Sequence, residues 1–214
     1  MALFNEEIKQ QVEERLAELG GDVRLVMFTR DGDCQFCEET QQMVEEVAGL
    51  SDNVTAEVYD LAADEAEAES YGVDKAPAIA VVGADDYGVR FYGIPSGYEF
   101  ASLLQAMELV ASGEAGLADA TVEALGRVDE PIHMQVFVTP TCPYCPGAVN
   151  LAHQMAVASP QVRADMVEAM EFQELSTQYQ VQGVPRTVIN ETVHIEGAVP
   201  ESAVLEGLAQ ALAS

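Results

Sequence analysis

The hydrophobic and polar positions of this chain form one pattern that occurs twice. Short apolar runs bounded by turn residues are typical of buried strands, and apolar positions every three or four residues are typical of helices. Each half is predicted to contain a helix, a strand, a helix, a strand, a helix, two strands and a final helix. In the first half we expect these elements at 6–19, 23–28, 34–50, 54–59, 64–71, 78–82, 89–92 and 97–112. In the second half we expect them at 117–125, 132–138, 142–158, 162–168, 172–179, 187–190, 192–196 and 201–212.

An internal repeat supports the same division. Cys34 precedes Pro77 by 43 residues, and Cys142 precedes Pro185 by 43 residues. Each proline ends a Y-x-V-x-x-x-P motif, and the two copies are offset by 108 residues. Matches in register indicate duplication of one α/β unit. The join between the copies is short, so we expect them to pack together. The predicted units are 1–114 and 115–214.

All four cysteines lie in two C-x-x-C pairs, Cys34–Cys37 and Cys142–Cys145. Each pair follows a predicted strand and is predicted to open a helix. At a helix N-terminus the dipole and unpaired N–H groups stabilise a thiolate on the first cysteine. The second cysteine, one turn further, is close enough to close a disulfide. Such pairs are typical of a dithiol redox centre or of a metal site.

The spacing of the candidate ligands favours the redox interpretation over a zinc site. The two pairs are 105 residues apart, whereas zinc ribbons place theirs about 15–20 residues apart. None of the three histidines shows ligand spacing to either pair, and His153 is expected to be an ordinary surface or half-buried residue. We therefore expect no metal and no bound cofactor. The histidines are His133, His153 and His194.

The chain is strongly acidic, with 37 acidic and 9 basic residues and a formal charge of −28. Such a surface repels phosphates, so no nucleic-acid partner is expected. Self-repulsion destabilises a compact chain of this charge and molar salt relieves it, so the composition indicates a salt-rich cytoplasm, as in a halophile. An ordinary acidic protein is the alternative. With no apolar run of membrane length and no secretory signal, we expect a cytoplasmic protein without membrane contact.

These features resemble the thioredoxin fold, in which a strand leads into C-x-x-C at a helix start and a distant proline precedes another strand. Two such units in one chain resemble the archaeal protein disulfide oxidoreductases, also described as glutaredoxin-like proteins. The resemblance includes the segments TPTCPYCP at 139–146, GIPSGYEF at 93–100 and GAVPE at 197–201. It implies an α/β fold of two tandem thioredoxin-fold units, with mixed central sheets flanked by helices.

The resemblance also implies which residues form the sites. Both cysteine pairs would alternate between dithiol and disulfide, with Pro77 and Pro185 in cis peptide bonds facing the sulfurs. A cis proline exposes the backbone before it, here at Ala76 and Val184, where an extended protein substrate can pair. The residues between the second pair of thiols complete the predicted substrate contacts, and they are Pro143 and Tyr144.

One position departs from the thioredoxin pattern. Many thioredoxins bury an acid on the strand six residues before the first cysteine, and here Phe28 and Val136 take those places. Glu168 or Glu171 is a candidate for the missing proton acceptor, although exposure to solvent is the usual state of such acids.

The leading interpretation is a thiol–disulfide oxidoreductase that reduces, forms or isomerises protein disulfides. Cys142 would attack a substrate disulfide and Cys145 would resolve the mixed disulfide. By resemblance, a thioredoxin-reductase-type flavoenzyme supplies the electrons. The alternatives are an electron carrier to a peroxiredoxin, a non-catalytic module whose cysteine pairs bind metal, and a glutathione-dependent glutaredoxin. For the last, Lys75 and Arg186 beside the two prolines are weak evidence.

The two cysteine pairs differ in their nearest charges. Four carboxylates surround the first pair, whereas uncharged residues flank Cys142. Like charge opposes formation of a thiolate. We therefore expect Cys142 to be the more reactive thiol and the second site to be the principal one. The four carboxylates are those of Asp31, Asp33, Glu38 and Glu39.

Overall fold

The computed structural model describes residues 3–32 and 34–213, and in these ranges it contains every helix and strand expected from the sequence. The bounds differ from the expected ones by at most three residues. The first half comprises α1 (Glu6–Leu16), β1 (Val23–Thr29), α2 (Cys37–Ala48), β2 (Val54–Asp60), α3 (Glu65–Tyr71), β3 (Ala78–Val82), β4 (Val89–Tyr92) and α4 (Glu99–Ser112). The second half comprises α5 (Asp119–Leu125), β5 (Ile132–Val138), α6 (Cys145–Ala158), β6 (Val162–Glu168), α7 (Gln173–Gln178), β7 (Arg186–Ile189), β8 (Val193–Glu196) and α8 (Glu201–Leu212).

The helices that carry the cysteine pairs begin at the second cysteine of each pair. The prediction that Cys34 and Cys142 open these helices is therefore wrong by about one turn. Cys142 lies in a turn in which its N–H donates to Thr139 O at 3.1 Å. Pro143 disfavours helical conformation at Cys142, but Cys34 also lies outside its helix although Gln35 follows it, so the shared turn does not require a proline. Each first cysteine still lies just ahead of a helix N-terminus.

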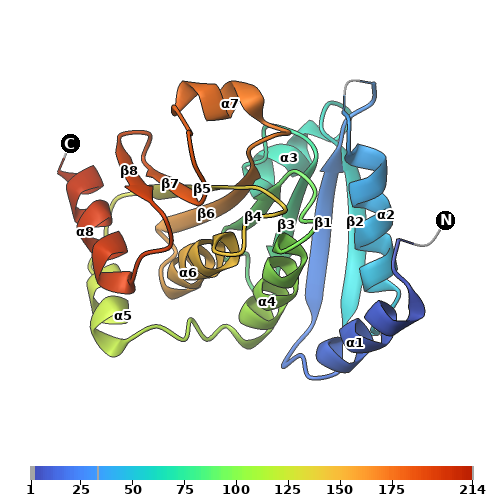
Figure 1. Ribbon diagram of the computed structural model, residues 1–214. Coiled ribbons are helices and arrows are strands. Elements are labelled where there is room, and N and C mark those ends of the chain that lie inside the picture. The colour runs from blue at the N-terminus through green and yellow to red at the C-terminus, as the bar shows by residue number, and fades with distance from the viewer. Residues whose placement is uncertain (1–2, 33, 214) are drawn as a thin grey trace.

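A single sheet of eight strands runs through both halves, in the order β2-β1-β3-β4-β6-β5-β7-β8 (Figure 1). The halves meet where β4 pairs in parallel with β6, with Val89 opposite Ala164 and Tyr92 opposite Val167. The other side of β4 pairs with β3, and that of β6 with β5. The pairing of β4 with β6 therefore covers two strands that would otherwise be exposed sheet edges.

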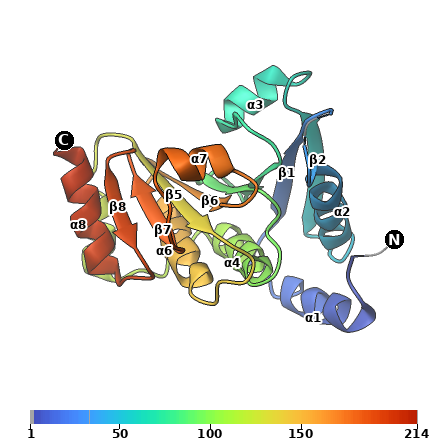
Figure 2. The ribbon, with the colours of Figure 1, turned by 45° about the horizontal axis from the view of Figure 1, so that its top comes forward.

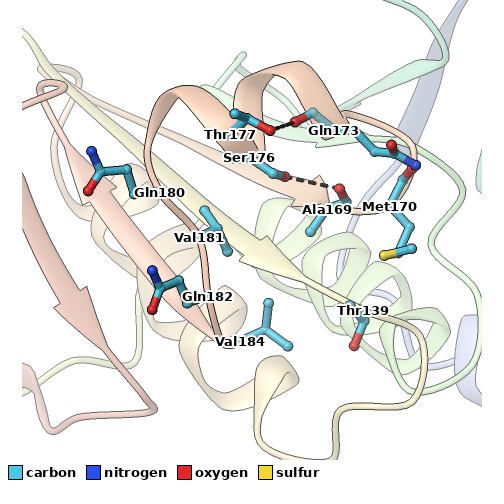
Figure 3. Close-up of a pocket in the computed structure, with 11 residues that line it drawn as sticks. Thr139, Ala169, Met170, Gln173, Ser176, Thr177, Gln180, Val181, Gln182 and Val184 are labelled. Atoms are coloured by element: carbon cyan, nitrogen blue, oxygen red, sulfur yellow. Dashed lines mark hydrogen bonds between the residues drawn. The ribbon is translucent and has the colours of Figure 1, made fainter.

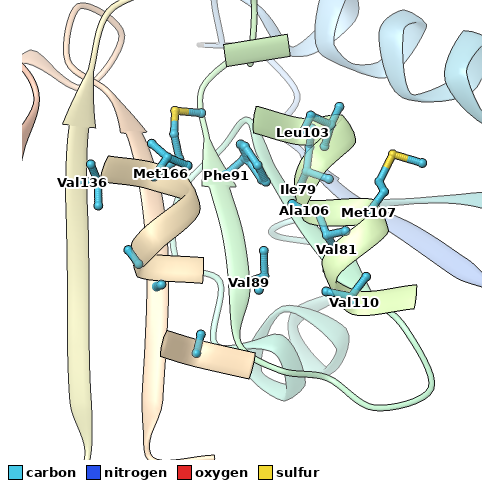
Figure 4. Close-up of a cluster of buried hydrophobic side chains, with 14 of the residues drawn as sticks. Ile79, Val81, Val89, Phe91, Leu103, Ala106, Met107, Val110, Val136 and Met166 are labelled. Atoms are coloured by element: carbon cyan, nitrogen blue, oxygen red, sulfur yellow. The ribbon is translucent and has the colours of Figure 1, made fainter. Parts of the chain in front are cut away.

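Two layers of helices cover the sheet (Figures 1 and 2). One face carries α1, α2, α4, α5, α6 and α8 around the larger hydrophobic cluster, and the other carries α3 and α7 around the smaller one. Side chains alternate between the faces, so Met134, Val136 and Val138 of β5 join the larger cluster and Phe137 joins the smaller one. At the junction of the halves, Phe91 of β4 lies between α4 and α6 (Figure 4).

Strand direction brings both cysteine pairs to one edge of the sheet, which we call the cysteine edge. β1, β4, β6 and β5 run in one direction, and β3 and β7 run in the opposite one. The turns after β1 and β5 lead to the cysteine pairs, and they share this edge with Pro77 and Pro185, which precede β3 and β7. Three strands lie between β1 and β5, so these two strands are four strand-to-strand spacings apart. At ~4.8 Å per strand, the two sites are about 19 Å apart.

Candidate functional site

Each cysteine pair is closed as a disulfide. The Cα–Cα distance is 5.5 Å in both Cys34–Cys37 and Cys142–Cys145, within the usual range for such bridges. In the second pair Cys142 is 7 % exposed and Cys145 is fully buried. In the first pair Cys34 is partly exposed and Cys37 is buried. In both pairs the first cysteine is therefore the more exposed one.

The two repeated prolines have the same local geometry. The Ala76–Pro77 and Val184–Pro185 peptide bonds are both cis, as the resemblance implies. The carbonyl of each proline accepts a backbone N–H, from Gly93 at 2.9 Å in the first unit and from Gly197 at 2.8 Å in the second. The two units thus build this part of the cysteine edge in the same way.

An open groove of about 640 Å³ lies beside Val184 at the second site (Figure 3). It extends from α7 to Thr139 at the end of β5, and none of its lining residues is charged. Val184 and Pro185 also line a smaller hollow of about 360 Å³. On the outer side of the disulfide, Tyr144 is 71 % exposed and its neighbour Pro143 is exposed too. Of the predicted contact residues of the second site, Pro143 and Tyr144 are therefore exposed and Val184 is partly exposed, whereas Pro185 is buried.

Neither β1 nor β5 carries an acid beneath its cysteine pair, because Phe28 and Val136 are both buried apolar residues. Of the two candidates from sequence, Glu168 ends β6 opposite Val138 and is only 4 % exposed. Its Oε2 accepts the N–H of Glu171 at 2.7 Å, and its Oε1 has no hydrogen-bond partner among the described residues. Burial raises the pKa of Glu168 above its ordinary value.

Glu171, the other candidate, reaches across to the first unit. Its Oε1 accepts the N–H of Ile94, just after β4, at 2.8 Å. Burial, and then the negative charges of Glu168 and Glu39, raise the pKa of Glu171 to about 7. Both candidate acids therefore lie at the cysteine edge, where β4 and β6 end between the two sites.

A third acid, Glu99, is more deeply buried, and sequence reasoning did not select it. Glu99 opens α4 and is 1 % exposed; its Oε2 accepts the Ser102 hydroxyl at 2.6 Å, and its Oε1 has no partner in the described part of the chain. Burial raises the pKa of Glu99 to about 7. The preceding N–H, of Tyr98, donates to Pro140 O at 3.0 Å, so α4 begins against the turn that leads into Cys142. The one sequence feature that could have indicated Glu99 is its position in the segment 93–100, which is part of the family resemblance.

The surroundings of the first disulfide are acidic. Glu38 and Glu39 are exposed in the first turn of α2, and Asp31 is exposed before it. Asp33, which also belongs to the predicted group, lies outside the described residues. The first turn of α6 has no acidic residue. The contrast in charge expected from the sequence is therefore present for the three carboxylates that can be described.

Two further findings are limited to residues 3–32 and 34–213. No group of three or more His, Cys, Asp or Glu residues there could hold a metal ion. No helix in these ranges has the length and apolar character needed to cross a membrane.

The sequence and the structure of this chain are similar to those of known proteins. Residues 132–210 match the family model described as a thioredoxin domain. The structure is similar to a protein disulfide oxidoreductase from Aeropyrum pernix, with a TM-score of 0.88, 30 % identity, and coverage of 94 % of this chain and 90 % of that one. It is also similar to the NTD_N/C domain of the alkyl hydroperoxide reductase AhpF from Enterococcus faecalis, with a TM-score of 0.87, 29 % identity, and coverage of 96 % and 99 %.

The fold and the two disulfides define a thioredoxin-fold thiol–disulfide oxidoreductase. Within this class, the chain belongs to the protein disulfide oxidoreductase family. Among curated proteins it is 26 % identical over 174 residues to an alkyl hydroperoxide reductase protein of Staphylococcus epidermidis, in a match that covers 81 % of this chain. The chain spans only about a third of the length of such relatives, 32 % in this case.

Proposed function

We propose that this oxidoreductase exchanges disulfides with protein substrates, and that Cys142 is its principal attacking thiol. The observation that supports this most directly is the second site, where the N–H of Cys142 donates to Thr139, a lining residue of the uncharged groove, and Cys145 is the more deeply buried cysteine. The Cys142 thiolate attacks one sulfur of a substrate disulfide, and the other substrate sulfur leaves as a thiolate. The Cys145 thiolate then attacks Cys142 Sγ, which frees the reduced substrate and leaves the Cys142–Cys145 disulfide. The reverse sequence oxidises a substrate dithiol.

In this proposal Glu99 accepts the proton of Cys145. The Cys145 thiol is fully buried and must lose its proton before it attacks, and β5 offers no acid. Glu99 is buried at the start of α4, against the turn before Cys142, with one carboxyl oxygen unpartnered among the described residues. A general base works best when its pKa lies near the working pH. The raised pKa of Glu99, about 7, meets this condition.

An extended substrate segment is proposed to pair with the backbone before each cis proline, at Val184 in the second site and at Ala76 in the first. The uncharged groove beside Val184 suits a neutral polar segment. It contains no base to pair with the carboxylates of glutathione, so the groove supports a protein substrate over a glutathione-dependent reaction. The exposed residues Pro143 and Tyr144 would contact the same substrate.

The test is reduction of insulin by dithiothreitol, together with a trapping experiment. The Cys145→Ser variant is expected to accumulate a mixed disulfide with a protein substrate through Cys142, visible on non-reducing gels. The Cys142→Ser variant serves as the matched control and should trap nothing. Equal trapping by both variants would contradict the assigned order of attack.

A second candidate is an electron carrier to a peroxiredoxin. The likeness to part of the alkyl hydroperoxide reductase proteins favours it, because that name denotes a peroxide-reducing system. In this version a thioredoxin-reductase-type flavoenzyme reduces the chain, which then reduces the peroxiredoxin. A reconstituted assay with both enzymes separates the candidates. Peroxide-dependent oxidation of nicotinamide cofactor that requires this chain supports the carrier, and a rate unchanged by its omission excludes it for the pair tested.

The two units are proposed to extend over 1–114 and 115–214, each with its own disulfide and cis proline. Their geometric equivalence supports the division. Limited proteolysis of the oxidised protein tests it. Early cleavage should fall between α4 and α5, and early cleavage inside either unit would contradict the boundary.

We also propose that the protein works in a salt-rich cytoplasm, because a formal charge of −28 requires strong screening. Its circular dichroism should show loss of structure between molar salt and about 0.05 M, where the Debye length is well above 10 Å. A spectrum unchanged over this range would exclude salt adaptation.

A further inference from the structure

One loop of the first unit contacts both redox sites. This loop joins β4 to α4, comprises residues 93–98, and is called the bridging loop below. It begins at Gly93, whose N–H donates to Pro77 O at 2.9 Å in the first site. It ends at Tyr98, whose N–H donates to Pro140 O at 3.0 Å, in the turn before the second cysteine pair. Any shift of this loop therefore reaches both sites.

Glu171 of the second unit contacts the bridging loop next to Gly93, near the start of the loop. Its Oε1 accepts the Ile94 N–H at 2.8 Å. Glu171 is itself held by Glu168, whose Oε2 accepts the Glu171 N–H at 2.7 Å. Of these three anchors of the loop, two are backbone carbonyls and only Glu171 acts through its side chain.

Gly93 leaves the space that this contact needs. A Cβ at Gly93 would lie 2.6 Å from Glu168 Cβ and 2.8 Å from Glu171 Oε1, and both distances are shorter than contact allows. The residue also has φ of +90°, a backbone conformation that side-chain-bearing residues rarely adopt. The loop is thus shaped to admit the Glu171 carboxylate.

We propose that Glu171 is a positioning residue for both redox sites, because it fixes the bridging loop that touches Pro77 in the first and Pro140 in the second. The inference rests on the proposed redox role of both cysteine pairs. It assigns Glu171 no contact with the reacting sulfurs. Its effect passes through the loop backbone to two sites that lie about 19 Å apart by strand spacing.

The strength of this anchor should depend on pH. Burial, together with the charges of Glu168 at the end of β6 and Glu39 of α2, raises the pKa of Glu171 to about 7. An ionised carboxylate accepts a stronger hydrogen bond from an N–H than its neutral form does. The Ile94 anchor should therefore tighten as the pH rises through about 7 and loosen below it.

The test uses two proteins that each keep one site. Cys34→Ser with Cys37→Ser leaves the second site, and Cys142→Ser with Cys145→Ser leaves the first. Glu171→Ala is expected to lower insulin reduction at least threefold in both proteins. Glu174→Ala is the matched control, since Glu174 is exposed and lies close by in the first turn of α7, and it should leave both rates unchanged.

Glu171→Gln separates positioning from a merely structural role. The glutamine still accepts the Ile94 N–H but resembles the protonated acid at every pH. At pH 6 its rates should match those of wild type, and at pH 8 wild type should be at least twofold faster at both sites. Amide hydrogen exchange at Ile94 should follow the same order, slowest in wild type at pH 8 and fastest in Glu171→Ala.

A loss confined to one site, or a ratio of wild type to Glu171→Gln that stays at one from pH 6 to pH 8, overturns the inference. If Glu171→Ala does not fold, the comparison with Glu171→Gln decides alone. Inactivity of both single-site proteins with Glu171 intact would instead contradict the proposed redox function. The two failures are therefore distinguishable.

Discussion

The two cysteine pairs have the same internal geometry and different surroundings. Both disulfides have a Cα–Cα distance of 5.5 Å, and both lie at the same sheet edge with a cis proline. Residues 1–114, however, hold 25 of the 37 acidic residues and six of the nine basic ones. Cys34 is also more exposed than Cys142. The two copies thus share the geometry of the redox disulfide, whereas the charged residues around the two disulfides differ.

The difference extends to the acids near each site. Glu99 of the first unit follows Tyr98, whose N–H donates to Pro140 of the second unit, and Glu171 of the second unit accepts the Ile94 N–H of the first. Neither unit contains its own buried acid on the strand before its cysteines. Under the roles proposed for Glu99 and Glu171, each site depends on the other half of the chain, and the following experiments measure how unequal the two sites are.

The largest expected effect comes from the attacking thiols. Cys142→Ser should abolish most insulin reduction, because it removes the attacking thiol of the site whose helix has no acidic residue in its first turn. Cys34→Ser should retain most of the activity. Turbidity assays on both variants, in molar salt, measure this directly. Near-full activity of Cys142→Ser would reverse the comparison and make the first site the principal one.

The next effect concerns Glu99, which should matter to the second site alone. Glu99→Gln should slow resolution of the Cys142 mixed disulfide at least tenfold, in line with loss of a general base. Stopped-flow measurements on the two single-site proteins would show it, and an equal loss at both sites would contradict the assignment.

Glu99→Gln should also change stability in a pH-dependent way. The folded pKa of about 7 lies above the ordinary value of 4.5, so the folded state binds more protons between these values and loses stability as the pH rises. The glutamine variant should therefore gain roughly 2.5 kcal/mol more, relative to wild type, at pH 8 than at pH 5. Denaturant unfolding at the two pH values provides the measurement, and a pH-independent difference would argue against a buried, titrating Glu99.

A smaller effect distinguishes the two cysteine-bearing helices. By the repeat offset, His153 of α6 corresponds to Glu45 of α2, yet His153 is 1 % exposed and Glu45 is exposed. Burial lowers the pKa of His153 to about 4. Because the unfolded state takes up the proton near pH 6.5, this histidine should cost roughly 2 kcal/mol of stability by pH 5. His153→Leu should remove that loss, whereas Glu45→Leu should not, as unfolding curves at pH 7 and pH 5 would show.

The smallest expected effect is a few-fold difference in alkylation. With limiting iodoacetamide at mildly acidic pH, Cys142 of the reduced protein should be labelled before Cys34, because acidic neighbours oppose thiolate formation at Cys34. The greater exposure of Cys34 acts in the opposite direction. Peptide mapping decides between charge and access, and faster labelling of Cys34 would show that access dominates.

Local patterns were sufficient to predict the elements and the pairing of each cysteine turn with its proline. The spacing of 43 residues from Cys142 to Pro185 and from Cys34 to Pro77 is a feature of the chain itself. The exact helix starts were missed in both copies, since α2 and α6 begin at the second cysteine of each pair and the first cysteine lies in the preceding turn. These errors concern one helical turn at the start of α2 and α6, and they do not change the order of the elements.

The contacts between the halves were not predictable in this way. From the sequence alone, an acid at a helix start such as Glu99 is expected to be exposed to solvent. It is buried because α4 begins against the turn at Pro140. His153 was expected to be at or near the surface, and that expectation was wrong because α4 and Phe91 cover its side of α6. Both errors come from the pairing of β4 with β6, which depends on residues far apart in sequence.

The pairing of β4 with β6 has a consequence for the chain as two fragments. If residues 1–114 and 115–214 were made as separate polypeptides, each would expose one bare strand with unsatisfied N–H and C=O groups along its length. The exposed β4 of one fragment pairs in register with the exposed β6 of the other. We therefore expect the fragments to be poorly soluble alone and to reassemble when expressed together. The pairing of β4 with β6 would then be a specific interface between the two fragments. In the intact chain, the covalent connection would serve mainly to keep β4 and β6 at high local concentration.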